Sequence, residues 1–232
     1  MFFYNTSYLI FMLPAFILMM LAQWYVSSSY GRWSKVPNRS GLSGADVARR
    51  LIDRGGLSGV SLEQARGRLS DHYDPREKVL RLSAGVAQSA SVAAAAIAAH
   101  ELGHAMQDRE DYFPLRLRAA LVPAVNIGSY LGWILLMVGI FLNSAGLAWL
   151  GVAVFAGGAV FALATLPVEL NASARARELL TTAGIITDEQ ERSGGNTVLN
   201  AAALTYVAAL FTAILQLLYF ASIVLGMGGR RR

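Results

Sequence analysis

The sequence contains no cysteine and three histidines. The lack of cysteine excludes a disulfide framework and thiolate chemistry, and it removes the usual indication of redox compartment. Charge is missing over long distances, because residues 1–31, 119–168 and 193–229 hold no Asp, Glu, Lys or Arg. The bilayer core requires roughly 20 apolar residues per helix, so stretches of this length predict a membrane protein rather than a soluble domain.

The charge-free stretches have room for four membrane-spanning helices. The first and last stretch hold one helix each, and the middle one holds two that are joined by a short polar turn at residues 143–146. The first segment lacks a basic start and ends in an aromatic belt, so we predict a retained anchor rather than a signal peptide. The expected organisation is a transmembrane helix at 7–27, a polar domain at 28–118, a transmembrane hairpin at 119–167, a helix at 168–200 and a fourth transmembrane helix at 201–226.

The two polar regions are separated by an even number of crossings and are therefore predicted to lie on the same side of the membrane. They hold every basic residue except the three arginines at 230–232. The positive-inside rule then favours a cytoplasmic position for both regions. The three terminal arginines conflict with this rule, because the fourth predicted span puts them on the opposite side. The formal net charge of +5 is attributed to orientation and lipid contact, so no nucleic-acid partner is expected.

The first polar region is predicted to contain short helices and strands. Ser43 can cap a helix that ends at the glycine pair 55–56, and Ser89 or Ser91 can cap a longer helix that reaches about Asp108. The segment 79–82 alternates enough to form a strand, either an edge strand that pairs with an extended substrate or an ordinary buried strand. The chain is thus expected to be a mainly α membrane protein with a small α+β part.

The stretch AHELGHA at residues 99–105 holds two of the three histidines. On a helix, His100 and His104 project from the same face and can bind one zinc ion. Glu101 then lies where a carboxylate can accept a proton from a water molecule that the metal activates. The competing interpretation is an ordinary polar helix face without a metal.

A catalytic zinc site takes three protein ligands and an open position. The histidine of the metzincin extension is missing downstream, which excludes that class. Glu169 is the best third ligand, because it is the first charge after 50 uncharged residues and is predicted to lie on the same side as the histidine pair, on a helix that begins after Pro167. Asp108 suits a partner of a ligand better than a ligand. The candidate carboxylates are Asp108, Glu110, Asp111, Glu169 and Glu178.

Four sequence blocks together resemble the YugP-type bacterial membrane zinc metallopeptidases. The blocks are LSDHYDPREKVLRLS at 69–83, AAHELGHAMQ at 98–107, PLRLRAALVP at 114–123 and LPVELNAS at 166–173. The layout is also similar to that of HtpX-like membrane proteases. The resemblance implies a zincin-like domain at the surface of the bacterial inner membrane, with one zinc ion per chain held by His100, His104 and Glu169.

In the wider group, an aspartate four residues after the third ligand orients a histidine ligand. Ser173 stands at that place here, so the resemblance leaves Asn171, Ser173 or Asp108 for the orienting role. A developing oxyanion needs a further donor besides the metal. The candidates for that donor are His72, Tyr73, Arg175 and Arg177.

Three functions compete at this level. The leading hypothesis is a zinc endopeptidase that cleaves membrane or membrane-proximal polypeptides, with Glu101 as general base. The alternative is a membrane adaptor or chaperone partner with a structural zinc site, closed by a fourth ligand such as His72. A small transporter is the weakest hypothesis, since no predicted span carries an ionisable side chain. Segments rich in Ala and Gly permit close helix packing, which is compatible with a homo-oligomer.

Overall fold

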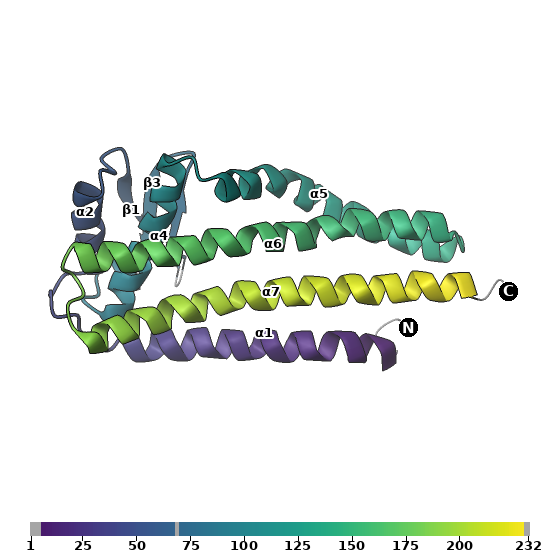
Figure 1. The fold of residues 1–232 in the computed structure, drawn as a ribbon, viewed down its shortest axis with the longest axis horizontal. Coiled ribbons are helices and arrows are strands. Elements are labelled where there is room, and N and C mark those ends of the chain that lie inside the picture. Colours follow the sequence, from purple (N-terminus) through teal and green to yellow (C-terminus); the bar gives the residue numbers. More distant parts are fainter. Residues whose placement is uncertain (1–5, 68–69, 230–232) are drawn as a thin grey trace. The chain divides into compact units, whose positions relative to one another are not determined.

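The computed structural model describes residues 6–67 and 70–229, which form seven helices and three strands (Figure 1). The fold is mainly α with a small α+β part, as the sequence predicted. The elements in chain order are α1 (Thr6–Trp33), α2 (Gly44–Arg54), β1 (Ser61–Ala65), β2 (His72–Asp74), β3 (Val79–Ser83), α3 (Ala84–Ala87), α4 (Val92–Arg109), α5 (Phe113–Phe141), α6 (Ala145–Thr182) and α7 (Glu189–Gly229).

Four of the helices, α1, α5, α6 and α7, are long and apolar enough to cross a membrane. This confirms the four spans expected from the charge-free stretches. Two helices extend well beyond the predicted spans. Helix α6 continues through Pro167, so the prediction of a separate helix after this proline is wrong. A proline removes only one hydrogen bond of a helix. The helical turns on both sides of Pro167 are sufficient to continue α6 across this residue. Helix α7 likewise begins at Glu189, ahead of the span predicted at 201–226.

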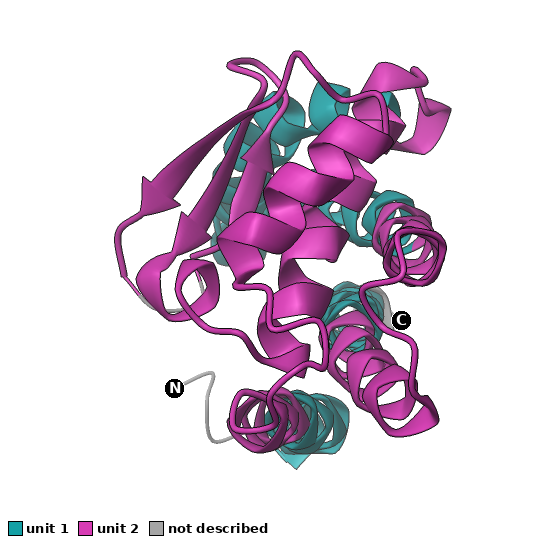
Figure 2. Ribbon diagram, turned by 90° about the vertical axis from the view of Figure 1, so that its left-hand side faces the viewer, with its two compact units in different colours: residues 1–22, 116–166, 205–232 teal, residues 23–115, 167–204 magenta. Residues whose placement is uncertain are grey.

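The chain divides into two compact units (Figure 2). Unit 1 comprises residues 1–22, 116–166 and 205–232. Within it, α5 and α6 approach closely, because a Cβ atom on Gly139 would lie 2.4 Å from the backbone nitrogen of Ala148. The turn between them contains Asn143 in a left-handed conformation (φ 51°), at the place where the sequence predicted a polar turn. The buried core of unit 1 consists of Leu136, Ala148, Val152, Tyr219, Phe220 and Val224.

Unit 2 comprises residues 23–115 and 167–204 and contains the sheet (Figure 2). The strand order is β1-β3-β2, in which β3 pairs in parallel with β1 and antiparallel with β2. The central strand carries Leu80 and Leu82, whose side chains are fully buried. Of the two alternatives for the segment 79–82, the buried strand is therefore confirmed and the edge strand is wrong. Alternating hydrophobicity alone does not distinguish an edge strand from a central strand, since it does not show which other strands pair with it.

Helix α4 is the central helix of unit 2. Its N-terminus is capped by Ser91, whose hydroxyl oxygen accepts a hydrogen bond of 3.2 Å from the backbone nitrogen of Ala94. The alanines that follow the cap are almost all buried, and their small side chains allow neighbouring elements to approach the helix closely. Leu51 of α2, Leu102 of α4 and Leu180 of α6 belong to the same core cluster. This packing fixes the helix that carries both histidines of AHELGHA.

Candidate metal centre

Two helices of unit 2 bring three ligand-type side chains together. Helix α4 supplies His100 and His104, and α6 supplies Glu169, which is only 2% exposed. The Oε2 atom of Glu169 lies 3.2 Å from His100 Nε2 and 3.5 Å from His104 Nε2. One ligand atom from each residue lies within 4.8 Å of the other two. Side chains that are 69 residues apart in the chain thus converge on one point.

The spacing of these atoms fits a zinc ion. Zinc bonds of about 2.0–2.2 Å in a tetrahedral arrangement separate neighbouring ligand atoms by roughly 3.3–3.6 Å. The separations of 3.2 and 3.5 Å between Glu169 Oε2 and the two histidine nitrogens are close to this range. Two imidazoles and one carboxylate are also a typical donor set of catalytic zinc, which keeps a fourth position open. Among residues 6–67 and 70–229, no other group of three metal-binding side chains is found.

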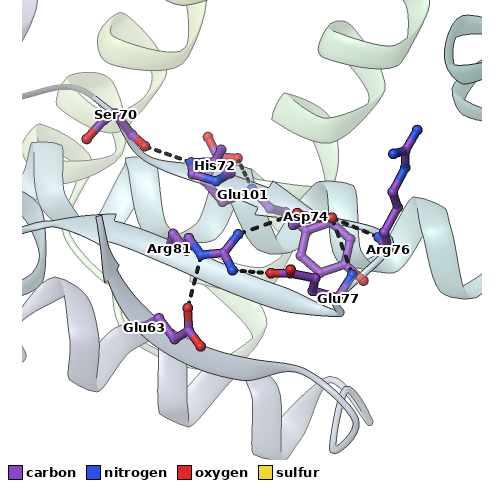
Figure 3. A network of polar contacts seen from close by, with 9 residues as sticks. Glu63, Ser70, His72, Asp74, Arg76, Glu77, Arg81 and Glu101 are labelled. Atoms are coloured by element: carbon purple, nitrogen blue, oxygen red, sulfur yellow. Dashed lines mark hydrogen bonds and ion pairs between the residues drawn. The ribbon is translucent and has the colours of Figure 1, made fainter. Parts of the chain in front are cut away.

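Glu101 is held by the strand next to the histidine helix. Its Oε2 atom accepts a hydrogen bond of 3.1 Å from the backbone nitrogen of Tyr73 on β2. Figure 3 shows Glu101 beside this strand, near His72. Burial is the largest influence on the Glu101 carboxyl and raises its pKa above the ordinary value, although His100 and His104 oppose the shift. The carboxyl is therefore positioned through one oxygen and lies in an environment that favours proton uptake.

A cluster of charges on the sheet holds β2 against its neighbours (Figure 3). Arg81 on β3 forms an ion pair of 3.0 Å with Glu63 on β1, another of 3.4 Å with Asp74 on β2, and a third with Glu77. Exposed ion pairs of this kind each stabilise a protein by only about 0–1 kcal/mol. Arg81 on β3 nevertheless joins β1, β2 and the connection between β2 and β3. The cluster therefore positions β2 more than it adds to stability.

Asp108 and Tyr73 contact each other rather than the histidines. The Tyr73 hydroxyl donates a hydrogen bond of 2.7 Å to Asp108 Oδ2, and the Lys78 ammonium pairs with the same carboxylate. Burial and this hydrogen bond raise the pKa of the Tyr73 phenol, so the phenol stays protonated. The imidazole of His72 is exposed, and its Nδ1 atom lies 2.8 Å from the backbone oxygen of Ser70. His72 is not part of the three-residue group.

Ser173 lies at the other side of the centre, where its Oγ atom is 3.2 Å from His100 Nδ1. The two arginines suggested as oxyanion donors have other contacts. Arg175 donates a hydrogen bond of 2.7 Å to Asn171 Oδ1 and pairs with Glu110 at 2.7 Å. Arg177 donates hydrogen bonds to Asn196 Oδ1 at 2.8 Å and to Asn200 Oδ1 at 2.6 Å. Glu178, another candidate ligand, is exposed and does not belong to the three-residue group.

The sequence reasoning missed Gln107. This side chain is fully buried, and its Oε1 atom lies 3.0 Å from His104 Nδ1. The available signal was a polar amide three residues after His104 on the same helix. The spacing in the sequence is equally compatible with a contact between Asp108 and His104. Only the rotation of α4 against α6 decides whether Gln107 or Asp108 contacts the histidine.

Gly103 lies between the two histidines, where α4 and α6 are in backbone contact. A Cβ atom at this position would lie 2.5 Å from the backbone oxygen of Ala172. We therefore expect Gly103→Ala to separate the two helices and to lower the free energy of unfolding by roughly 1–3 kcal/mol, as overpacked sites do. Chemical or thermal unfolding of the purified protein measures this change.

The matched control is Gly31→Ala on α1. Nothing lies within 4 Å of a Cβ atom at this glycine, so the substitution only adds helix propensity. We expect its stability to equal or slightly exceed that of wild type. If Gly103→Ala were as stable as Gly31→Ala, close backbone contact would not be needed at this position.

Comparison with known proteins assigns the chain to a family. The family described as "Putative neutral zinc metallopeptidase" matches residues 8–225. The chain belongs to this family. A protein of Bacillus subtilis (strain 168) that is called "Putative membrane protease YugP" is 45% identical over 204 residues, which cover 88% of this chain and 90% of the relative. No solved structure matches the chain significantly.

The family assignment agrees with the geometry of the site. A zinc metallopeptidase family implies zinc, and the group of His100, His104 and Glu169 offers ligands that suit this metal. The named relative and the four apolar helices identify a membrane protein. The resemblance inferred from the four sequence blocks is therefore confirmed, since the match covers all of them.

Proposed function

We propose that this protein is a zinc-dependent endopeptidase that hydrolyses peptide bonds of membrane or membrane-proximal polypeptides. The observation that carries the proposal is the convergence of His100, His104 and Glu169 beside a glutamate that the adjacent strand holds in place. One zinc ion per chain is expected in this site. Family membership supports the reaction class, and the relative called a membrane protease supports a protease that acts at the membrane.

Zinc in this site would supply Lewis-acid polarisation of the scissile carbonyl and would lower the pKa of water. The residues of the chain perform the remaining steps. Glu101, held through Oε2 by the backbone nitrogen of Tyr73, uses its other carboxylate oxygen to accept the proton of the attacking water. The same carboxyl then delivers this proton to the leaving amine. Burial, which raises the pKa of the Glu101 carboxyl, supports its role as proton acceptor.

An open metal site favours catalysis over a structural role. A structural zinc site is usually closed by four protein ligands, whereas the described group contains three. His72, which the adaptor hypothesis requires as a fourth ligand, lies with its Nδ1 atom 2.8 Å from the backbone oxygen of Ser70. The geometry therefore supports the peptidase better than the adaptor.

We also infer that the protein crosses the inner membrane of a bacterium several times, with the active site on the cytoplasmic side. The support is the concentration of basic residues in the two polar regions, which the positive-inside rule places in the cytoplasm. In the sequence, Glu169 directly follows a stretch without charges that is long enough to span the bilayer. A metal ligand at that position suits polypeptides that reach the site from the membrane.

Removal of the metal tests the proposed function. We expect protein purified in mild detergent to contain about one zinc ion per chain and to cleave an unfolded membrane-protein substrate. Treatment with a chelator should abolish cleavage, and added zinc should restore it. Metal analysis and gel-based cleavage assays measure the two effects. Full cleavage by metal-free protein would overturn the peptidase mechanism, and an absence of zinc under all conditions would remove its basis.

A further inference from the structure

We propose that Gln107 is a positioning residue that fixes the tautomer of His104. Through this fixed tautomer, the Nε2 atom of a neutral His104 ring stays unprotonated and available to a metal that Glu169 also binds. The inference rests on the proposed function, because it assigns a role within the same metal site. It concerns a residue that the sequence did not single out.

The amide of Gln107 bridges the two helices that carry the metal-binding residues. The side chain of Gln107 is 0% exposed. Its Oε1 atom lies 3.0 Å from His104 Nδ1 on α4, and its Nε2 atom donates to the backbone oxygen of Val168 at 2.7 Å and to Asn171 Oδ1 at 2.9 Å on α6. Val168 directly precedes Glu169. The bridge therefore joins the His104 imidazole to the turn of α6 that presents the third ligand.

The contacts determine which atom of the amide faces the histidine. A backbone oxygen can only accept hydrogen bonds, so the atom of Gln107 that faces Val168 must be the amide nitrogen. The oxygen of the same amide then faces His104 and can only accept. Consequently, His104 must carry its proton on Nδ1, and in the neutral imidazole Nε2 is unprotonated. This nitrogen lies 3.5 Å from Glu169 Oε2.

A second group with a single hydrogen-bonding role supports the same assignment. The guanidinium of Arg175 can only donate, and its Nε atom donates to Asn171 Oδ1 at 2.7 Å. Asn171 Oδ1 must therefore be an acceptor, which again requires a nitrogen at the Gln107 atom that faces it. Arg175 is itself held by Glu110 at 2.7 Å. The orientation of the Gln107 amide is thus determined from both Val168 and Arg175.

His100 has a weaker constraint of this kind. Its Nδ1 atom contacts the hydroxyl of Ser173 at 3.2 Å, and a hydroxyl can either donate or accept. The structure therefore assigns the fixed tautomer to His104 alone. Partners of histidine ligands typically change metal affinity by 10- to 100-fold when they are lost, because they orient the ring and set its basicity.

The tautomer can be measured directly in wild-type protein. We expect nitrogen NMR of histidine-labelled, metal-free protein to show His104 with a proton on Nδ1, and the signal is assigned by its loss in His104→Ala. A neutral His104 ring in this sample that carries its proton on Nε2 and none on Nδ1 would overturn the proposal. The measurement requires neither zinc nor activity, and a variant is used only to assign the signal.

Two substitutions at Gln107 test the consequence for the metal. Gln107→Leu removes the acceptor for His104, and we expect zinc affinity to fall by about 10- to 100-fold. Gln107→Glu retains an acceptor for His104 but loses the donor to Val168 and Asn171, so we expect its affinity to lie between those of Gln107→Leu and wild type. Gln190→Leu is the matched control, since Gln190 is exposed on α7. Competition with a chromophoric chelator gives the affinities, and the absorption spectrum of bound cobalt reports the ligand geometry.

The outcomes separate a positioning role from a structural one. The proposal is supported if Gln107→Leu has a lower zinc affinity and an altered cobalt spectrum, and if Gln107→Glu recovers part of the affinity. It is overturned if Gln107→Leu binds zinc as tightly as wild type, or if the two variants lose affinity equally although both are folded. If wild type binds zinc and cleaves while Gln107→Leu is unchanged, only this inference fails. If wild type binds no zinc, the proposed function fails with it.

Discussion

Substitution of Glu101 by Gln is expected to reduce peptide hydrolysis by about 10²- to 10⁴-fold, which is the usual contribution of a general base. Zinc binding should persist, because His100, His104 and Glu169 are unchanged. The backbone nitrogen of Tyr73 can still donate to the amide oxygen of the new side chain, so the local geometry should be retained. Cleavage rates and zinc content, measured on the same preparation, check both expectations.

The control for this variant is Glu178→Gln. Glu178 is an exposed carboxylate on α6 that lies outside the metal-binding group, so its substitution should change neither cleavage nor zinc content. Glu101→Gln protein that cleaved at the wild-type rate would show that another group accepts the proton. A loss of zinc in Glu101→Gln would instead show that Glu101 supports the metal rather than the reaction.

Substitution of Glu169 by Ala is expected to weaken zinc binding by more than about 100-fold, because even an indirect partner of a ligand contributes 10- to 100-fold. The carboxylate is the member of the group that α6 contributes, and its Oε2 atom lies close to both histidines. Its removal leaves two imidazoles on α4 as ligands. Metal analysis and chelator competition in detergent measure the loss, and cleavage should disappear with it.

Glu178→Ala is the matched control on the same helix, and it should retain zinc. Glu110 and Glu178 were both plausible third ligands from the sequence, whereas only Glu169 joins the group among the described residues. Zinc that survived Glu169→Ala at wild-type affinity would move the third ligand elsewhere. Thermal unfolding of the metal-free proteins shows whether a loss of zinc reflects the missing carboxylate or a loss of the fold.

The sequence determined the membrane helices and the histidine helix of this protein, because both depend on local properties of the chain. A stretch without charges is readable directly, since the bilayer excludes charged side chains wherever they occur. The capped helix with His100 and His104 is equally local, because the spacing of the two residues is a property of one helix. Glu169 was favoured by its position at the end of a charge-free stretch, and the structure brings it to the histidines.

Only the tertiary structure decided which side chains surround those ligands. The position of β3 at the centre of the sheet depends on its pairing with β1 and β2, which both precede it in the sequence, and no local pattern reports that pairing. The contacts of Gln107 likewise depend on how α4 packs against α6, where Gly103 and Ala172 approach closely. The same packing turns Asp108 toward Tyr73 and Lys78. Packing between helices distant in sequence thus decided the partners of these side chains, whereas spacing within a single helix predicted only the pair of His100 and His104.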